Sequence, residues 1–128
     1  MHFRVIDQGA YGAGSQAGVA VATDAATYES LWTQIAGRPG PSKVDFAKES
    51  AIFLSVGTRP TGGYGVEPLE ISSDGDTVVI KTRMKAPPPG GIVTMALTAP
   101  YAVVAVDRPH VTRVRWLDEG GNVIAEVK

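Results

Sequence analysis

The feature that most constrains the fold is a run of apolar segments after residue 45, separated by turn residues with no helical pattern between them. These segments lie at residues 51–56, 66–72, 77–85, 92–98, 101–106, 111–117 and 123–127. Strands that follow one another without helices pair antiparallel in sandwiches or barrels. The chain contains 15 Gly and 9 Pro among 128 residues, which supplies the turns such a fold requires. With two N-terminal segments, 3–7 and 17–22, the sequence predicts eight or nine strands.

Three of these segments carry further detail. Residues 51–56 are apolar on both alternations, as in a strand covered on both faces. Residues 66–72 alternate, which predicts that Leu69 and Ile71 share one face. Asp74-Gly75 then predicts a tight hairpin, because both residue types tolerate a positive φ.

One segment has the pattern of a helix. Thr23 and Asp24 are both N-cap types, and apolar side chains follow at positions 28, 31, 32 and 35, the spacing of one helix face. Gly37 ends the pattern. We expect a helix over residues 24–36 that packs Leu31 and Trp32 on a sheet. The predicted fold class is mainly β (α+β): one domain, residues 1–128, with an antiparallel β-sandwich or barrel of about eight strands and one packed α-helix.

The residue types present exclude several chemistries. Without cysteine, thiol catalysis, disulfides and thiolate metal sites are ruled out. His2 and His110 are too few for a histidine metal site, and Glu67 and Glu70, three apart, are expected on opposite faces of a strand. Gly12-Ala13-Gly14 lacks the third glycine and the helix of a dinucleotide site. We therefore expect no enzyme activity, no metal and no cofactor.

The location of the protein is left open by the sequence. No apolar run approaches the ~20 residues that span a bilayer, so we expect no membrane span. The first residues lack the pattern of a signal peptide. The chain as it stands therefore reads as cytoplasmic, or as exported if a signal was removed before residue 1. The oligomeric state is also open.

Basic residues gather in the second half of the chain. Lys81, Arg83 and Lys85 alternate on one strand, and Arg113 and Arg115 on another. If these strands are neighbours, the five residues form a basic face that would bind an anionic partner. Such a face would equally serve to keep an exposed sheet soluble and unpaired. We do not expect a nucleic-acid partner, because the net charge is −1 and no aromatic residues are interleaved with the basic ones.

Three loops stiffened by proline and glycine are candidate binding elements. Their residues are Thr61, Gly62, Gly63 and Tyr64 in the first, Pro89 and Gly90 in the second, and Pro100 and Tyr101 in the third. Stiff loops that carry an aromatic ring lose little entropy on binding, which favours a recognition surface for a protein partner. Two alternatives are open: that the tyrosines cap the core, or that they form a ligand or enzyme pocket with Thr61 and His110.

Several of these motifs together resemble the family of PrcB C-terminal domains. The matching features run in order through residues 18–107: the helix Tyr28–Trp32, Val44-Asp45-Phe46, the strand 51–57, Pro60–Tyr64, Pro89-Gly90-Gly91, residues 93–98 and Pro100–Val104. The resemblance implies a small non-catalytic domain that associates with or stabilises a protease complex, often in an exported or lipid-anchored protein. The hairpin after residue 110 has no counterpart in it.

The order of the three loops is also similar to that of the chagasin-type inhibitors of cysteine proteases, which present three loops from one end of a β-sandwich. Tyr101 stands here where those inhibitors have a tryptophan. Because a single expected strand, 92–98, separates the second loop from the third, we expect these two loops at opposite ends of the fold.

Overall fold

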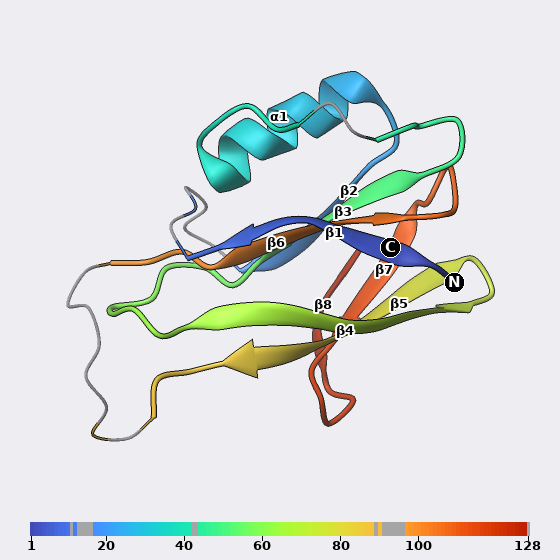
Figure 1. Ribbon diagram of the computed structural model, residues 1–128. Coiled ribbons are helices and arrows are strands. Elements are labelled where there is room, and N and C mark those ends of the chain that lie inside the picture. The colour runs from blue at the N-terminus through green and yellow to red at the C-terminus, as the bar shows by residue number, and fades with distance from the viewer. Residues whose placement is uncertain (11, 13–16, 42–43, 89, 91–96, 128) are drawn as a thin grey trace.

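Two four-stranded sheets and one helix are stacked in three layers in the computed structural model of the chain (Figure 1). The structure describes residues 1–10, 12, 17–41, 44–88, 90 and 97–127. Its strands are β1 (Phe3–Gly9), β2 (Gly18–Ala22), β3 (Ser50–Ser55), β4 (Gly65–Asp74), β5 (Thr77–Lys85), β6 (Tyr101–Val106), β7 (Arg113–Leu117) and β8 (Val123–Val127). The helix is α1 (Ala25–Ala36).

The predicted mainly β class is confirmed, and the sheets are not closed into a barrel. The first sheet has the order β1-β6-β3-β2 and is antiparallel throughout. The second has the order β4-β5-β7-β8, and its central pair β5–β7 is parallel, unlike the antiparallel pairing expected. The chain leaves the second sheet after β5 and forms β6 in the first. It then re-enters as β7, so the hairpin geometry that enforces antiparallel pairing does not apply.

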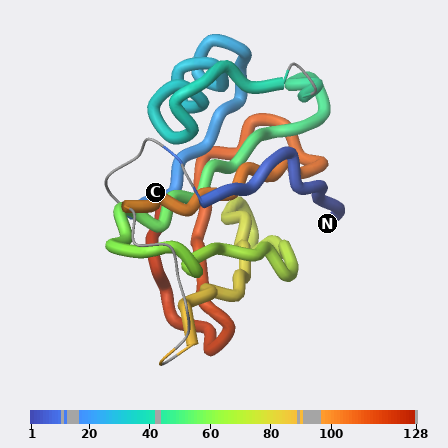
Figure 2. The backbone as a smooth tube through the Cα atoms, turned by 60° about the vertical axis from the view of Figure 1, so that its left-hand side comes forward, coloured from blue at the N-terminus to red at the C-terminus, as the bar shows by residue number. Residues whose placement is uncertain are grey.

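The central strands of the first sheet are buried on both faces, as the sequence predicted for residues 51–56. Every residue of β3 and β6 is buried. Side chains such as Ile52 and Leu54 face the second sheet and meet Trp116, whereas Phe53 and Val103 face the helix. Figure 2 shows α1 on this outer face, and among the described residues no helix lies on the outer face of the second sheet.

The helix lies where the sequence placed it. The Asp24 carboxylate accepts a hydrogen bond of 2.7 Å from the backbone N–H of Thr27, which satisfies an N-terminal amide. Gly37 ends the helix at φ 73°, a left-handed conformation that glycine adopts without strain. Trp32 is fully buried with its ring edge-on to Phe53, at 5.9 Å between centroids.

The predicted β4–β5 hairpin forms, with its two-residue loop at Gly75-Asp76, one position later than the Asp74-Gly75 expected. Strand β4 departs from regular alternation. Asp74 pairs with Thr77, and only Gly75 of the two-residue loop has a positive φ, 61°. A bulge between residues 68 and 70 leaves Leu69 37% exposed, while Ile71 is buried. The expectation that these two side chains share a face was wrong, because the bulge inserts an extra residue.

The same bulge changes the placement of the two glutamates of β4. Glu67 pairs with Arg83 and Glu70 with Lys81, two positions that lie on one face of β5. The glutamates therefore share the outer face of the second sheet, and the expectation of opposite faces was wrong for the same reason.

The strand expected at residues 92–98 falls largely outside the described residues. Of it, Leu97 is 73% exposed, and Thr98 forms an antiparallel bridge with Arg59. In the described part of the chain, no helix combines the length and the apolar character needed to cross a membrane.

Candidate functional site

A groove of about 290 Å³ opens at one end of the two sheets and brings the two candidate tyrosines together. It lies where β1 and β5 end and β4 and β6 begin. Its lining residues are Gln8, Gly9, Tyr64, Gly65, Val66, Lys85 and Tyr101. We call it the tyrosine groove. Both sheets contribute to it, so the site exists only once the layers are packed.

The loop before β4 is fastened to the chain segment that precedes β6. Arg59 and Thr98 exchange two backbone hydrogen bonds, of 2.7 and 2.9 Å. The Thr98 hydroxyl donates a third, of 2.8 Å, to the carbonyl of Thr61. Gly63 has a φ of 89°, which explains a glycine at this position. The Thr61 hydroxyl donates to the carbonyl of Gly62 at 3.0 Å, so it serves the loop itself.

Tyr64 is held at the groove by an arginine. The ring is half-buried, and the guanidinium carbon of Arg59 lies 5.6 Å from its centroid, a cation–π distance. The Nε of Arg59 is buried and has no hydrogen-bond partner among the described residues. The guanidinium contact supports the Tyr64 ring on one side.

Tyr101 belongs to the core, and the expectation of a displayed ring is corrected. The side chain is 5% exposed and packs in the cluster beneath the helix. Gly9 on the neighbouring strand β1 leaves room for the ring, since a Cβ at this position would lie 3.1 Å from Cε1 of Tyr101. Its hydroxyl donates to Oδ2 of Asp7 at 2.9 Å and accepts from Nη2 of Arg38 at 2.9 Å.

This polar cluster of Asp7, Arg38 and Tyr101 joins the chain after α1 to the first sheet. Arg38 also pairs with Asp7 and lies over the Trp32 ring, 5.3 Å from its centroid. Burial, together with the hydrogen bond to Asp7, raises the pKa of Tyr101 above its ordinary value. The phenol therefore keeps its proton at neutral pH and acts as a fixed structural donor.

The other candidate loop residues differ in solvent exposure. Gly62 and Pro100 are buried, Gly63 and Gly90 are exposed, and Pro89 lies outside the described residues. Because Tyr101 and Pro100 are buried, the third loop does not display an aromatic ring as the inhibitor-like arrangement would require.

The relation of the second loop to the third stays a prediction, because Pro89 and most of the expected strand 92–98 lie outside the described residues. The position of His110 is described. His110 follows β6, whose six residues carry the chain roughly 17 Å from the groove. Neither His110 nor Thr61 lines the groove, so the four-residue pocket considered from the sequence does not form.

The five predicted basic residues do share one face, because β5 and β7 are neighbours. Acidic side chains are interleaved with them. The ion pairs are Lys85–Glu67 at 3.4 Å, Arg83–Glu119 at 3.5 Å, Arg115–Asp74 at 3.9 Å and Arg115–Glu126 at 3.9 Å. The outer face of the second sheet thus carries charges of both signs. A surface that binds a nucleic-acid backbone is instead uniformly basic. Within the described ranges, no group of three or more possible ligand side chains is placed to hold a metal ion.

Sequence reasoning missed the partners of the tyrosines. Gln8, Gly9 and Lys85 in the groove, and Asp7 and Arg38 around the phenol, come from segments far apart in the chain. No local signal marks them, because their proximity depends on how β1 and the residues after α1 pack on β6.

The comparisons with known proteins agree with part of the resemblance. Residues 50–107 match the family model described as PrcB C-terminal. The match covers β3 to β6 and includes Tyr64, Lys85 and Tyr101 of the groove. The helix motif at residues 28–32 lies before the matched span, although the sequence resemblance extended over it. No curated protein and no solved structure matches the chain.

Proposed function

We propose that this protein, which carries a PrcB C-terminal domain over residues 50–107, is a non-catalytic accessory domain that binds another protein through the tyrosine groove. The observation that carries the proposal is Tyr64, a half-buried ring held at the groove by Arg59. A ring that is already fixed loses little conformational entropy when a partner covers it. Aromatic side chains in such positions dominate the energetics of many interfaces.

The polar groups of the groove favour docking over catalysis. Lys85 is paired with Glu67 at 3.4 Å, and the Tyr101 hydroxyl is occupied by Asp7 and Arg38. Nucleophilic catalysis requires a nucleophile beside a base within hydrogen-bond reach. The groove residues that the structure describes contain no such pair. These residues offer a partner an aromatic ring, a backbone without a side chain at Gly65 and the charge of Lys85.

We take the class of partner from the family resemblance, which implies association with a protease complex. In this proposal a segment of a protease subunit covers Tyr64, and the domain stabilises the complex without cleaving peptides itself. Five of the groove residues lie in the matched span, so the surface belongs mainly to the part of the chain that the family shares.

Site-specific photo-crosslinking tests this proposal. Benzoylphenylalanine is placed at Tyr64 and, as a control, at Val123, an apolar position of β8 that is 51% exposed. We expect a protease subunit to crosslink at position 64 only, and Tyr64→Ala to abolish its co-purification. Equal crosslinking at both positions, crosslinking at neither, or hydrolysis of labelled casein by the purified chain would contradict the proposal.

A further inference from the structure

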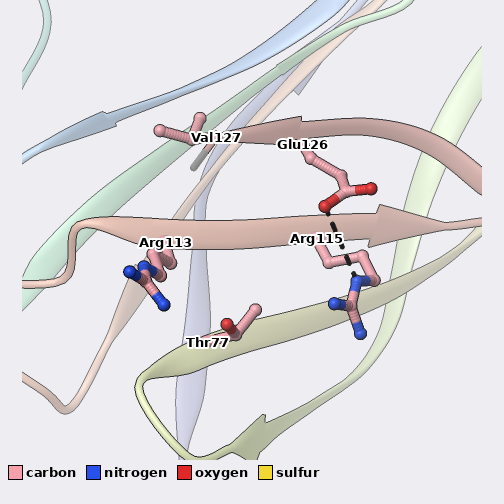
Figure 3. A pocket seen from close by; sticks show the side chains of 5 residues that line it. All are labelled: Thr77, Arg113, Arg115, Glu126 and Val127. Carbon is pink, nitrogen blue, oxygen red and sulfur yellow. Dashed lines mark ion pairs between the residues drawn. The ribbon is translucent and has the colours of Figure 1, made fainter.

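A second hollow, of about 320 Å³, lies on the outer face of the second sheet. It is lined by Thr77 of β5, Arg113 and Arg115 of β7, and Glu126 and Val127 of β8. Figure 3 shows the two arginine side chains leaving β7 on the same side, with Thr77 beside them on β5. We call this the arginine hollow. Its β7 and β8 residues lie beyond the span that matches the family, and the tyrosine groove shares no residue with it.

The hollow is rich in hydrogen-bond donors that the described residues leave unused. A guanidinium carries five N–H donors, and the guanidinium groups of Arg113 and Arg115 form no hydrogen bond of 3.5 Å or less with the described residues. Arg115 has carboxylates on two sides, Asp74 and Glu126, but each lies 3.9 Å away, beyond hydrogen-bond distance. Arg113 has no ion pair in the same residues. Such donors match the oxygens of a carboxylate, which guanidinium groups bind through two parallel bonds.

The spacing of the two arginines favours an extended peptide as the occupant. Arg113 and Arg115 are alternate residues of one strand, so their side chains leave the sheet roughly 6.6 Å apart. The alternate side chains of any extended peptide have the same spacing. A peptide lying along β7 with carboxylates at positions i and i+2 would therefore present one carboxylate to each guanidinium.

The charges around the hollow favour a peptide over a nucleic acid. Glu126 lines the hollow and Asp74 borders it, so a continuous row of phosphates would meet repulsion at two points. A peptide carries its carboxylates at discrete positions and avoids these neighbours. The absence of an aromatic side chain among the five lining residues also removes the stacking that single-stranded nucleic acids use.

We propose that the arginine hollow binds an acidic, extended segment of a partner protein that carries carboxylates at alternate positions. Arg113 and Arg115 each take one carboxylate, the Thr77 hydroxyl supplies a further donor, and Glu126 limits the charge that the hollow accepts. This site is separate from the tyrosine groove, and the proposal does not rest on the groove having a partner.

Fluorescence anisotropy at low salt tests the proposal with labelled peptides on the full chain. The probe contains Gly-Glu-Thr-Glu-Gly, and its controls replace both Glu by Gln or move the second Glu one position along. We expect the probe to bind at least about tenfold more tightly than either control, because only it matches the arginine spacing. The affinity should fall as salt is raised from 20 to 200 mM, because the added ions screen the attraction between the exposed charges of peptide and hollow.

Variants at the surface separate this site from general charge attraction. Arg113→Gln with Arg115→Gln should weaken binding about tenfold or more, and Arg113→Lys with Arg115→Lys should weaken it several-fold, because a lysine lacks the planar fork. The matched control, Lys81→Gln with Arg83→Gln, removes the same two positive charges from β5 outside the hollow and should change affinity less than about twofold.

Two further substitutions complete the test. Glu126→Gln should tighten binding, because it removes the acidic residue of the hollow. Tyr64→Ala should leave the peptide affinity unchanged, which separates this site from the proposed function. The proposal is overturned if the Lys pair binds as tightly as the native chain, or if Lys81→Gln with Arg83→Gln is as damaging as the Gln pair. It is also overturned if inorganic phosphate or single-stranded DNA competes as well as the probe peptide.

Discussion

A buried hydrogen bond between Trp116 and Thr82 links two inward-facing side chains of β7 and β5. Trp116 Nε1 donates to Thr82 Oγ1 at 2.8 Å, and both side chains are fully buried. Replacing Thr82 by valine keeps the shape of the side chain and removes the acceptor. A buried donor left without a partner costs about 1–3 kcal/mol. We therefore expect Thr82→Val to lower the free energy of unfolding by about that amount.

A double-mutant cycle isolates this hydrogen bond from changes in packing. Trp116→Phe removes the donor and also leaves a cavity, so its own cost is larger and does not report on the bond. The Thr82 hydroxyl also donates a hydrogen bond of 3.2 Å to the carbonyl of Leu117, and Thr82→Val removes this bond in both backgrounds. In the Trp116→Phe background no indole N–H is left unpaired, so Thr82→Val should then cost less than in the native chain, by the part that belongs to the indole donor. The expected coupling between the two sites is about 1–2 kcal/mol, well above the ~0.5 kcal/mol scatter of independent sites.

Urea unfolding at 25 °C, followed by circular dichroism, measures all four proteins. With a urea m-value of roughly 2 kcal/mol/M for a small domain, Thr82→Val should lower the midpoint by about 0.5–1.5 M. Equal m-values in the four proteins are needed for the comparison. A valine substitution that costs the same in both backgrounds would refute the reasoning, because the loss would then come from packing and not from the indole donor.

Three further substitutions or conditions test the helix and its contacts. Gly40→Ala should destabilise the fold by about 1–3 kcal/mol, since a Cβ there would overlap the buried indole of α1, whereas Gly18→Ala, with open space around it, should be nearly neutral in the same urea assay. Burial raises the pKa values of Tyr28 and Tyr101 above those in the unfolded chain. Their contribution to the free energy of unfolding should therefore be fully present below about pH 10 and be lost as the pH rises above it. Tyr101→Phe should flatten this loss in unfolding curves taken from pH 9 to 11.5. The backbone N–H of the first turn lowers the pKa of Asp24, so its contribution is present above about pH 4 and lost below it, and Asp24→Asn should flatten the acid limb of thermal-melting curves.

Features that depend on neighbours in the chain were readable from the sequence. The cap at Asp24, the apolar helix face around Trp32 and the left-handed stop at Gly37 are local, and the structure places all three as expected. The doubly apolar pattern of residues 51–56 likewise indicated a strand buried on both faces. A local backbone conformation and a periodic burial pattern are enough for such predictions, because the physics behind them acts over a few residues.

The tyrosines show where local reasoning ends. Both were recognised as candidate site residues, yet only Tyr64 keeps a half-buried ring at the groove, whereas Tyr101 is buried with its hydroxyl bound to Asp7 and Arg38. Its burial follows from contacts with chain segments about 60 and 90 residues away, which no periodicity reports. The PrcB-like motif thus indicated the chain segments that line the groove, but not the environment of each tyrosine ring.

The second sheet shows the same division between local pattern and tertiary arrangement. The alternating basic residues of β5 and β7 were visible in the sequence, but their shared face required β7 to pair with β5 in parallel. The bulge beside Pro68 turned Leu69 outward and placed Glu67 on the side of Glu70. The sequence alone predicted most helices and strands and their buried faces, because backbone preferences and side-chain alternation act over a few residues. Packing of the layers decided which elements meet, because that choice depends on contacts between residues distant in the chain.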